Sequence, residues 1–199
     1  PHTHWDREWY MSFERHRYRY VKLMDTLLDL LDKYPEDDYY FHMDGQVVIL
    51  HDYLQVRPQN EARLKKYTQS GRIQVGPFFI LQDEFLICAE ANVRNLMYGL
   101  REARKFTDKP SMVGYFPDAF GNISQVPQIL RGFGVDAVVF GRGVSAIGAD
   151  NTVEENRPVK VPSELMWESP DGSKVLGVLF SNWYCNGMEV PRDKDEAVA

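Results

Sequence analysis

A helix is predicted wherever apolar residues recur every three or four positions along the chain. The longest such segment runs from about Phe13 to Lys33 and stops before Pro35. Shorter segments with this pattern predict helices over about 47–54, 61–70, 89–106 and 124–131. In the helix over 89–106 the residues expected on one apolar face are Val93, Leu96, Met97 and Leu100.

Short apolar or aromatic runs between these helices predict strands. They lie at about 39–43, 72–75, 112–116, 136–140, 164–168 and 174–181. The turn sequence Pro170-Asp171-Gly172 joins the last two strands as a hairpin. The segment from about Ser145 to Pro162 has no regular period, and we expect it to be irregular.

The order of these elements predicts an α/β fold. Strand and helix alternate at roughly 30 to 40 residues per unit, which favours a parallel sheet with crossover helices, either a barrel or an open sheet. No glycine-rich phosphate-binding motif follows a strand, so a dinucleotide-binding fold is set aside.

Composition narrows the class of protein. The chain has 199 residues, enough for one sizeable domain, and its net charge of −6 argues against nucleic acid as a partner.

Aromatic residues make up 13% of the chain. Such side chains either form a core or pack against the apolar face of a sugar ring. The two cysteines, Cys88 and Cys185, lie far apart in the sequence, and no signal peptide or membrane span is visible. These features favour a soluble cytoplasmic protein. The abrupt start and end suggest a fragment of a longer protein.

Polar residues collect directly after the predicted strands. They are Asp44, Asp83, Asp118, Arg142 and Asn182. The carboxyl ends of parallel strands meet at one edge of an α/β fold and form the rim of the active site. We therefore expect these residues to share one site.

The first ten residues add a candidate metal site. His4 and Asp6 lie two apart, so an extended segment presents both on one face. An imidazole and a carboxylate make half of a zinc site, and Asp118 is the best candidate to complete it. His2 is an alternative ligand, although it lies deeper in the segment.

Each of the other site candidates has a structural alternative. Asp44 precedes Gly45 and either belongs to a turn or contacts substrate. Asp83, next to Glu84, either belongs to a solvated loop or bonds a sugar hydroxyl. Arg142 either pairs with a carboxylate, which is the default, or binds substrate. Trp9 is either core or stacks on a sugar. Asn182 and Trp183 either line the site or do not.

Two motifs carry a family resemblance. His4-Trp5-Asp6-Arg7-Glu8-Trp9 and Pro117-Asp118-Ala119-Phe120-Gly121-Asn122 resemble the zinc-dependent α-mannosidases of glycoside hydrolase family 38, in their bacterial branch. The stretches 76–86, 90–95 and 140–144 are similar to that branch too. The resemblance implies the N-terminal catalytic domain, a distorted seven-stranded (β/α) barrel with a parallel sheet and crossover helices, incomplete at both ends. Helical-bundle and β-sandwich domains are expected downstream.

The resemblance also implies roles for individual residues. His4, Asp6 and Asp118 would bind one zinc ion, Asp118 would also be the nucleophile, and Trp9 would lie under the sugar. The fourth ligand, a histidine, is expected beyond residue 199 because no histidine follows His51, and the general acid/base is expected there too. Trp5, Arg7, Glu8, Ala119 and Asn122 depart from the animal enzymes and leave the cleaved linkage open.

The leading hypothesis is thus a retaining exo-α-mannosidase that acts on mannose-containing oligosaccharides or glycoconjugates. The alternatives are a 6-phosphomannosyl-glycerate hydrolase of the same family, a zinc-dependent sugar deacetylase, and a sugar-binding domain without catalysis. We expect neither nucleic acid nor membrane as a partner, and a homo-oligomer of the full-length protein stays open. The 199 residues alone are expected to bind zinc poorly and to be inactive.

Overall fold

A computed structural model describes residues 1–144, 162–185, 187, 191 and 193–198. The helices are α1 (Phe13–Lys33), α2 (Val48–Val56), α3 (Glu61–Gln69), α4 (Ala89–Ala103), α5 (Val126–Gly132) and α6 (Lys194–Val198), with the 3-10 helix η1 (Pro58–Asn60). The strands are β1 (Phe41–His42), β2 (Ile73–Gln74), β3 (Val113–Phe116), β4 (Ala137–Phe140), β5 (Glu164–Glu168), β6 (Lys174–Leu179) and β7 (Ser181–Tyr184). Each predicted helix and strand is present, although α4 ends at Ala103 and the strand predicted over 174–181 is divided into β6 and β7. The predicted irregular segment falls almost wholly outside the described residues.

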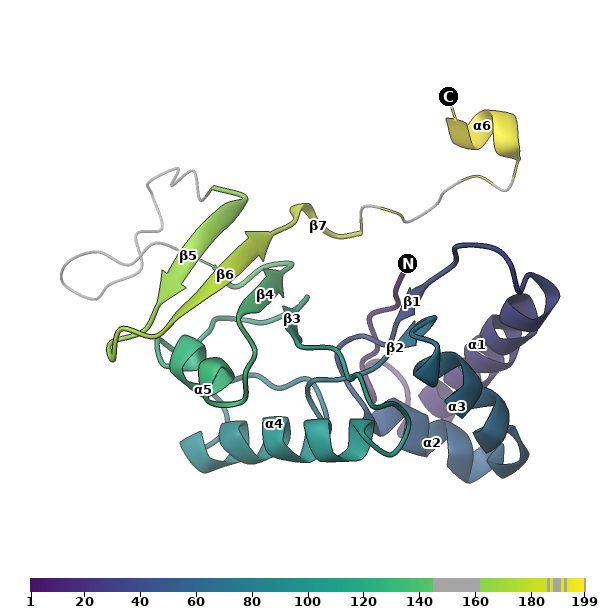
Figure 1. The fold of residues 1–199 in the computed structure, drawn as a ribbon, viewed down its shortest axis with the longest axis horizontal. Helices are drawn as coiled ribbons and strands as arrows, with labels where there is room; N and C mark the ends of the chain where they lie inside the picture. The colour runs from purple at the N-terminus through teal and green to yellow at the C-terminus, as the bar shows by residue number, and fades with distance from the viewer. Residues whose placement is uncertain (145–161, 186, 188–190, 192, 199) are drawn as a thin grey trace.

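The strands form two sheets, in agreement with the predicted α/β class (Figure 1). β1 and β2 make a parallel pair, and the larger sheet has the order β3-β4-β6-β5. β3, β4 and β6 are parallel, and β5 returns antiparallel to β6 as the predicted hairpin. Over the described residues the sheets thus contain two and four strands and do not close into a seven-stranded barrel.

Two apolar clusters hold the fold together. The first packs α1, α2 and α3 against β1 and β2, and the second packs α4 and α5 against β3, β4 and β6. α1 begins and ends where the sequence predicts, and its buried side chains are Tyr20, Val21, Met24, Leu27, Leu28 and Leu31. Burial of such apolar side chains is the largest favourable contribution to folding.

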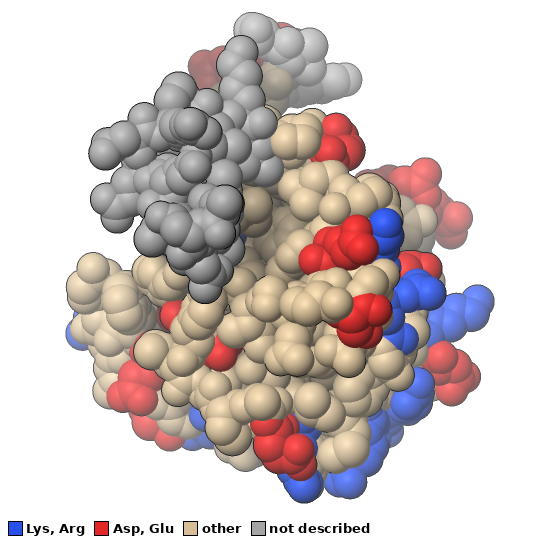
Figure 2. All heavy atoms as spheres, turned by 90° about the vertical axis from the view of Figure 1, so that its left-hand side faces the viewer, with Lys and Arg blue, Asp and Glu red and all other residues tan. Residues whose placement is uncertain are grey.

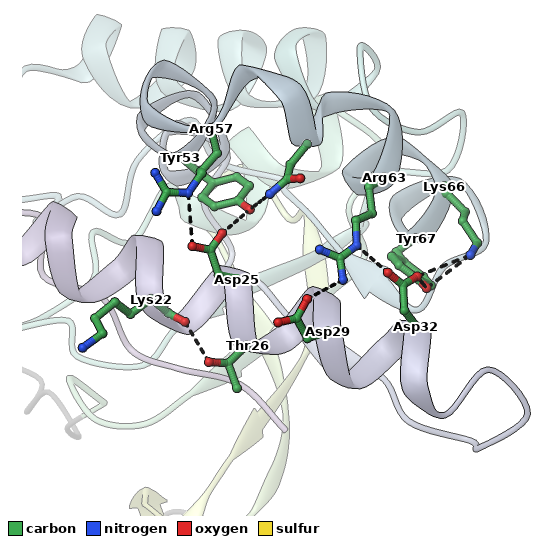
Figure 3. A network of polar contacts seen from close by, with 11 residues as sticks. Lys22, Asp25, Thr26, Asp29, Asp32, Tyr53, Arg57, Arg63, Lys66 and Tyr67 are labelled. Carbon is green, nitrogen blue, oxygen red and sulfur yellow. Dashed lines mark hydrogen bonds and ion pairs between the residues drawn. The ribbon is translucent and has the colours of Figure 1, made fainter.

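A polar network reinforces the contact of α1 with α2, with Arg57 directly after α2, and with α3 (Figure 3). Asp25 accepts a hydrogen bond from the hydroxyl of Tyr53 at 2.8 Å and pairs with Arg57 at 3.2 Å. Further along α1, Arg63 reaches Asp29 at 2.6 Å and Asp32 at 2.5 Å. Carboxylates spaced along one side of α1 thus meet cations from the segment that crosses it.

The expected apolar face of α4 is wrong in part. Val93 and Met97 are 37% and 41% exposed, while Leu96 and Leu100 are buried as predicted. The helix turns toward the loop after β2 on the side of Gly99, where a Cβ atom would lie 2.1 Å from the carbonyl oxygen of Pro77. This close approach of the two backbones sets the orientation of α4. The spacing of apolar residues along the helix does not indicate such a contact.

The outer surface carries charges of both signs. On the face in Figure 2 acidic and basic side chains are interspersed around a centre without charged residues.

None of the helices in the described part of the chain is long and apolar enough to cross a membrane. Cys88 and Cys185 are both free thiols.

Candidate active site

His4 lies at the centre of the predicted site. Its Nε2 atom is 3.5 Å from a carboxylate oxygen of Asp6 and 3.6 Å from one of Asp118. The segment that carries His4 is held beside β1 by a parallel bridge between His2 and His42. Asp118 follows β3, so the structure brings the three predicted metal ligands together from both sheets.

Asp44 fixes the imidazole of His4 from behind. Both of its carboxylate oxygens lie 3.2 Å from Nδ1 of His4, and one also accepts the backbone N–H of Trp5 at 2.6 Å and the amide of Gln46 at 2.8 Å. Burial raises the pKa of Asp44, although these hydrogen bonds and the charge of His4 oppose the rise. Burial lowers the pKa of His4, but Asp44, Asp6 and Asp118 outweigh it, so the net shift is upward.

The predicted substrate contact of Asp44 does not fit this arrangement. The residue does occupy a turn, with positive φ at Asp44 and Gly45, but its side chain is fully buried and its oxygens are used by protein groups. Asp44 therefore positions a predicted ligand. Sequence reasoning missed Gln46 entirely, and its only signal was its place beside Asp44 after a strand.

Arg142 is paired with Asp118, as the default expectation had it. Nε of Arg142 lies 2.5 Å from Asp118 Oδ1, and the guanidinium stacks over Phe120 at 4.2 Å. Gly141 permits the approach of the two loops, because a Cβ atom there would lie 2.0 Å from the carbonyl oxygen of Pro117. The loops after β3 and β4 are joined again by a 3.0 Å hydrogen bond from the Asn122 amide to Gly143.

Two aromatic side chains of β7 complete this edge. The ring of Tyr184 lies 5.0 Å from the ring of His4, and Trp183 lies 5.4 Å from the guanidinium of Arg142. Burial, and then the charge of Asp118, raise the pKa of Tyr184. The sequence pattern singled out Asn182 and Trp183 but not Tyr184.

A pocket of about 150 Å³ opens onto His4, Asp6 and Asp118. Asp83 lines it, as a sugar contact would require, while its neighbour Glu84 is buried and does not belong to a solvated loop. A second pocket of about 360 Å³ is also lined by His4 and Asp6, and includes Glu8. The two pockets therefore offer space for a small polar ligand next to the predicted metal ligands.

The remaining predictions have mixed outcomes. Trp9 is 62% exposed, so it is not core, and its ring contacts Tyr10. Stacking of Trp9 on a sugar stays a prediction. Asn182 belongs to β7, but its side chain lies outside the described residues.

The imidazole of His4 and the carboxylates of Asp6 and Asp118 are groups of the kind that bind zinc. No three His, Cys, Asp or Glu side chains within the described residues lie where they could together hold a metal ion. Nε2 of His4, however, is buried and has no hydrogen-bond partner among these residues. Its separations from the two carboxylates exceed a hydrogen bond and approach the roughly 3.4 Å expected between two ligands of a tetrahedral zinc ion.

Comparison with known proteins gives the family. Residues 1–198 match the family model described as "Glycosyl hydrolases family 38 N-terminal domain". The chain belongs to glycoside hydrolase family 38. A protein of Halalkalibacterium halodurans named "Putative mannosylglycerate hydrolase" is 54% identical over 98% of the chain and 22% of its own length.

The chain is also similar to a solved bacterial structure and to a eukaryotic α-mannosidase. The crystal structure of an α-mannosidase from Enterococcus faecalis superposes with a TM-score of 0.86 at 48% identity, over 99% of this chain and 21% of that one. α-Mannosidase G of Dictyostelium discoideum is 27% identical over 88% of the chain and 15% of its own length. The chain thus spans about a fifth of the length of the Halalkalibacterium halodurans and Enterococcus faecalis proteins.

Proposed function

We propose that the chain supplies the nucleophile and most zinc ligands of a retaining exo-α-mannosidase. The observation that carries the proposal is the position of His4 Nε2 between Asp6 and Asp118, with Nδ1 held by Asp44. An outer carboxylate that fixes the tautomer and orientation of a histidine is typical of metal sites. Family membership and the α-mannosidase among the solved relatives support the reaction and the sugar.

In this mechanism Asp118 attacks the anomeric carbon of mannose. A bond forms between the carboxylate oxygen and that carbon while the glycosidic C–O bond breaks, and the leaving oxygen takes a proton from a carboxylic acid. Water then attacks the same carbon, the bond to Asp118 breaks, and the carboxylate left by the first step takes the proton of the water. Each step inverts the anomeric carbon, so the configuration is retained overall. Arg142 holds one oxygen of Asp118 and leaves the other facing His4.

His4, Asp6 and Asp118 would hold the zinc ion. When bound, zinc orients sugar hydroxyls and stabilises charge that develops beside the anomeric carbon. Asp83 reaches the pocket from the loop after β2, where it can accept a hydrogen bond from a sugar hydroxyl. The ring of Tyr184 lies 5.0 Å from the ring of His4 at this edge of the site.

We also propose that the two sheets belong to one distorted seven-stranded barrel, as the sequence resemblance implies. The TM-score of 0.86 with a family 38 structure that is about five times longer supports this. Downstream helical-bundle and β-sandwich domains, a fourth histidine ligand, a homo-oligomer and a cytoplasmic location stay predictions.

A second candidate substrate is an α-mannoside of glycerate. The relative with 54% identity carries that activity in its name, which favours a small anionic aglycone. The phosphorylated form finds less support, because the two arginines beside the pockets are paired, Arg142 with Asp118 and Arg7 with Asp52 at 2.7 Å. The deacetylase alternative loses support, since only one imidazole nitrogen faces the predicted ligands among the described residues.

The test combines metal content and turnover in the full-length protein. Aryl α-mannoside, mannosylglycerate and its 6-phosphate are supplied to wild type, to a chelated sample and to Asp118→Ala. We expect about one zinc per chain, turnover of a mannoside, and its loss on chelation and on substitution. Bound zinc without cleavage of any mannoside would contradict the proposal.

A further inference from the structure

Glu84 is a buried carboxyl group that the mechanism does not use. Only 4% of the residue is exposed, although it lies in a loop between β2 and α4. Its Oε2 atom accepts a hydrogen bond from the backbone N–H of Ile123 at 3.0 Å. Ile123 belongs to the loop that carries Asp118, between β3 and α5.

The same two loops touch at a second point. Gly121 packs against the ring of Phe85, where a Cβ atom would lie 2.8 Å from Cε2, and its φ of +137° favours glycine. The loop of Asp118 is therefore fixed on one side by Glu84 and Phe85, and on the other by the bond from Asn122 to Gly143. Because β3 ends at Phe116, the residues that follow depend on such contacts for their position.

Glu84 does not face the pocket of Asp118. It lines a separate cavity of about 10 Å³ with apolar side chains of α4, α5 and β3, and with Gln82 and Asn92. The lining holds no other titratable side chain, and Asn92 has no hydrogen-bond partner among the described residues. Direct contact of Glu84 with a substrate at Asp118 is thus not supported, and its one hydrogen bond within the described part of the chain goes to the loop.

We propose that Glu84 is a positioning residue that sets the orientation of Asp118 by holding the backbone of Ile123. The proposal rests on the proposed role of Asp118 as nucleophile. A buried carboxyl group keeps an oxygen that accepts a backbone N–H in both its neutral and its ionised form. Without the oxygen of Glu84, the N–H of Ile123 has no acceptor at this position. The loop can then adopt other conformations, in which Asp118 no longer faces the anomeric carbon.

The test uses the full-length protein with Glu84→Ala, Glu84→Asp and Glu84→Gln. Glutamine keeps an acceptor oxygen at the same reach, whereas aspartate keeps the charge but is one methylene shorter. Glu90→Ala on α4 is the matched control, because Glu90 is exposed and pairs only with Arg94 among the described residues. Two quantities are measured: hydrogen exchange of the peptide over residues 117–125, and kcat with KM on an aryl α-mannoside.

We expect alanine and aspartate at position 84 to speed exchange at Ile123 by about tenfold or more. They should lower kcat by about tenfold to a hundredfold and leave KM within about twofold, since misplacement of a nucleophile acts on the chemical step. Glutamine should restore both quantities, and Glu90→Ala should change neither. If alanine does not fold, the aspartate and glutamine variants still give the comparison.

The inference is overturned if exchange and kcat are the same in all variants, or if glutamine is as impaired as alanine. A wild type that cleaves no mannoside contradicts the proposed function instead. In that case the exchange measurement alone decides whether Glu84 holds the loop.

Discussion

Nδ1 of His4 lies 3.2 Å from both carboxylate oxygens of Asp44, 40 residues further along the chain. This contact turns the opposite nitrogen, Nε2, toward Asp6 and Asp118. The backbone N–H of Trp5 and the amide of Gln46 hold Asp44 in turn. A fully buried carboxylate thus sets the direction of the one imidazole that the candidate metal site contains among the described residues.

Replacement of Asp44 by asparagine should weaken zinc binding about tenfold to a hundredfold. The amide keeps the size of the side chain but removes the charge that orients His4 and supports it as a ligand. Zinc affinity is measured by competition with a chelator of known affinity. Asp38→Asn, at an exposed position in the loop before β1, is the control. Equal zinc affinity in wild type and Asp44→Asn would show that Asp44 serves the fold alone.

Replacement of Arg142 by lysine should lower kcat about tenfold to a hundredfold. Lysine retains a positive charge, but it lacks the planar group that reaches Asp118 at 2.5 Å and stacks over Phe120. Turnover of an aryl α-mannoside is compared with that of Arg131→Lys, which alters an exposed arginine on α5. A kcat unchanged by Arg142→Lys would mean that charge alone suffices at this position.

Replacement of Glu84 by glutamine should stabilise the protein above neutral pH. Burial raises the pKa of Glu84 from 4.5 to about 7, while the bond from Ile123 opposes the rise and the charge of Asp83 adds to it. The folded state binds this proton more tightly than the unfolded state. The stability that the bound proton confers is therefore full below about pH 4.5 and is lost as pH rises through about 7.

At pH 8 the ionised carboxylate of Glu84 costs up to about 3 kcal/mol that glutamine avoids, and at pH 5 the two proteins should be similar. Melting temperatures of both are compared between pH 5 and pH 8. Glu90→Gln should show no pH-dependent difference from wild type, because that side chain is exposed. A difference in melting temperature between wild type and Glu84→Gln that stays constant with pH would refute the raised pKa of Glu84.

Replacement of Tyr53 by phenylalanine should destabilise the packing of α1 against α2 by about 1–2 kcal/mol. The hydroxyl donates to Asp25 at 2.8 Å and accepts from Asn60 at 2.6 Å, so its removal leaves both partners without this contact (Figure 3). The melting temperature is the measurement. Tyr18→Phe on the exposed side of α1 is the control and should leave it unchanged. Equal melting temperatures for Tyr53→Phe and wild type would show that the hydroxyl adds nothing to stability.

The elements that the sequence predicts well are those that local signals define. An uninterrupted apolar stripe followed by Pro35 is enough to delimit α1. Asp118 and Arg142 could be placed at one site because each follows a strand of a parallel sheet, and the strands β3 and β4 are indeed neighbours. These inferences need only the period of the chain and the geometry of parallel strands.

Long-range packing accounts for the predictions that did not hold. The role of Asp44 depends on the bridge between His2 and His42, which no local period reveals. Glu84 reads as part of a charged loop beside Asp83, yet α4 and α5 bury it. The orientation of α4 follows from the approach of the Pro77 backbone to Gly99, which the apolar residues of the helix do not encode.

The identity of the nucleophile is the central claim, and covalent labelling tests it most directly. The full-length protein is incubated with a 5-fluoro-mannosyl fluoride, whose glycosyl ester hydrolyses slowly, and its peptides are mapped by mass spectrometry. We expect one mannosyl adduct on Asp118, formed by wild type and absent from Asp118→Asn. An adduct on another carboxylate, or turnover that survives in Asp118→Asn, would contradict the assignment of Asp118 as the nucleophile.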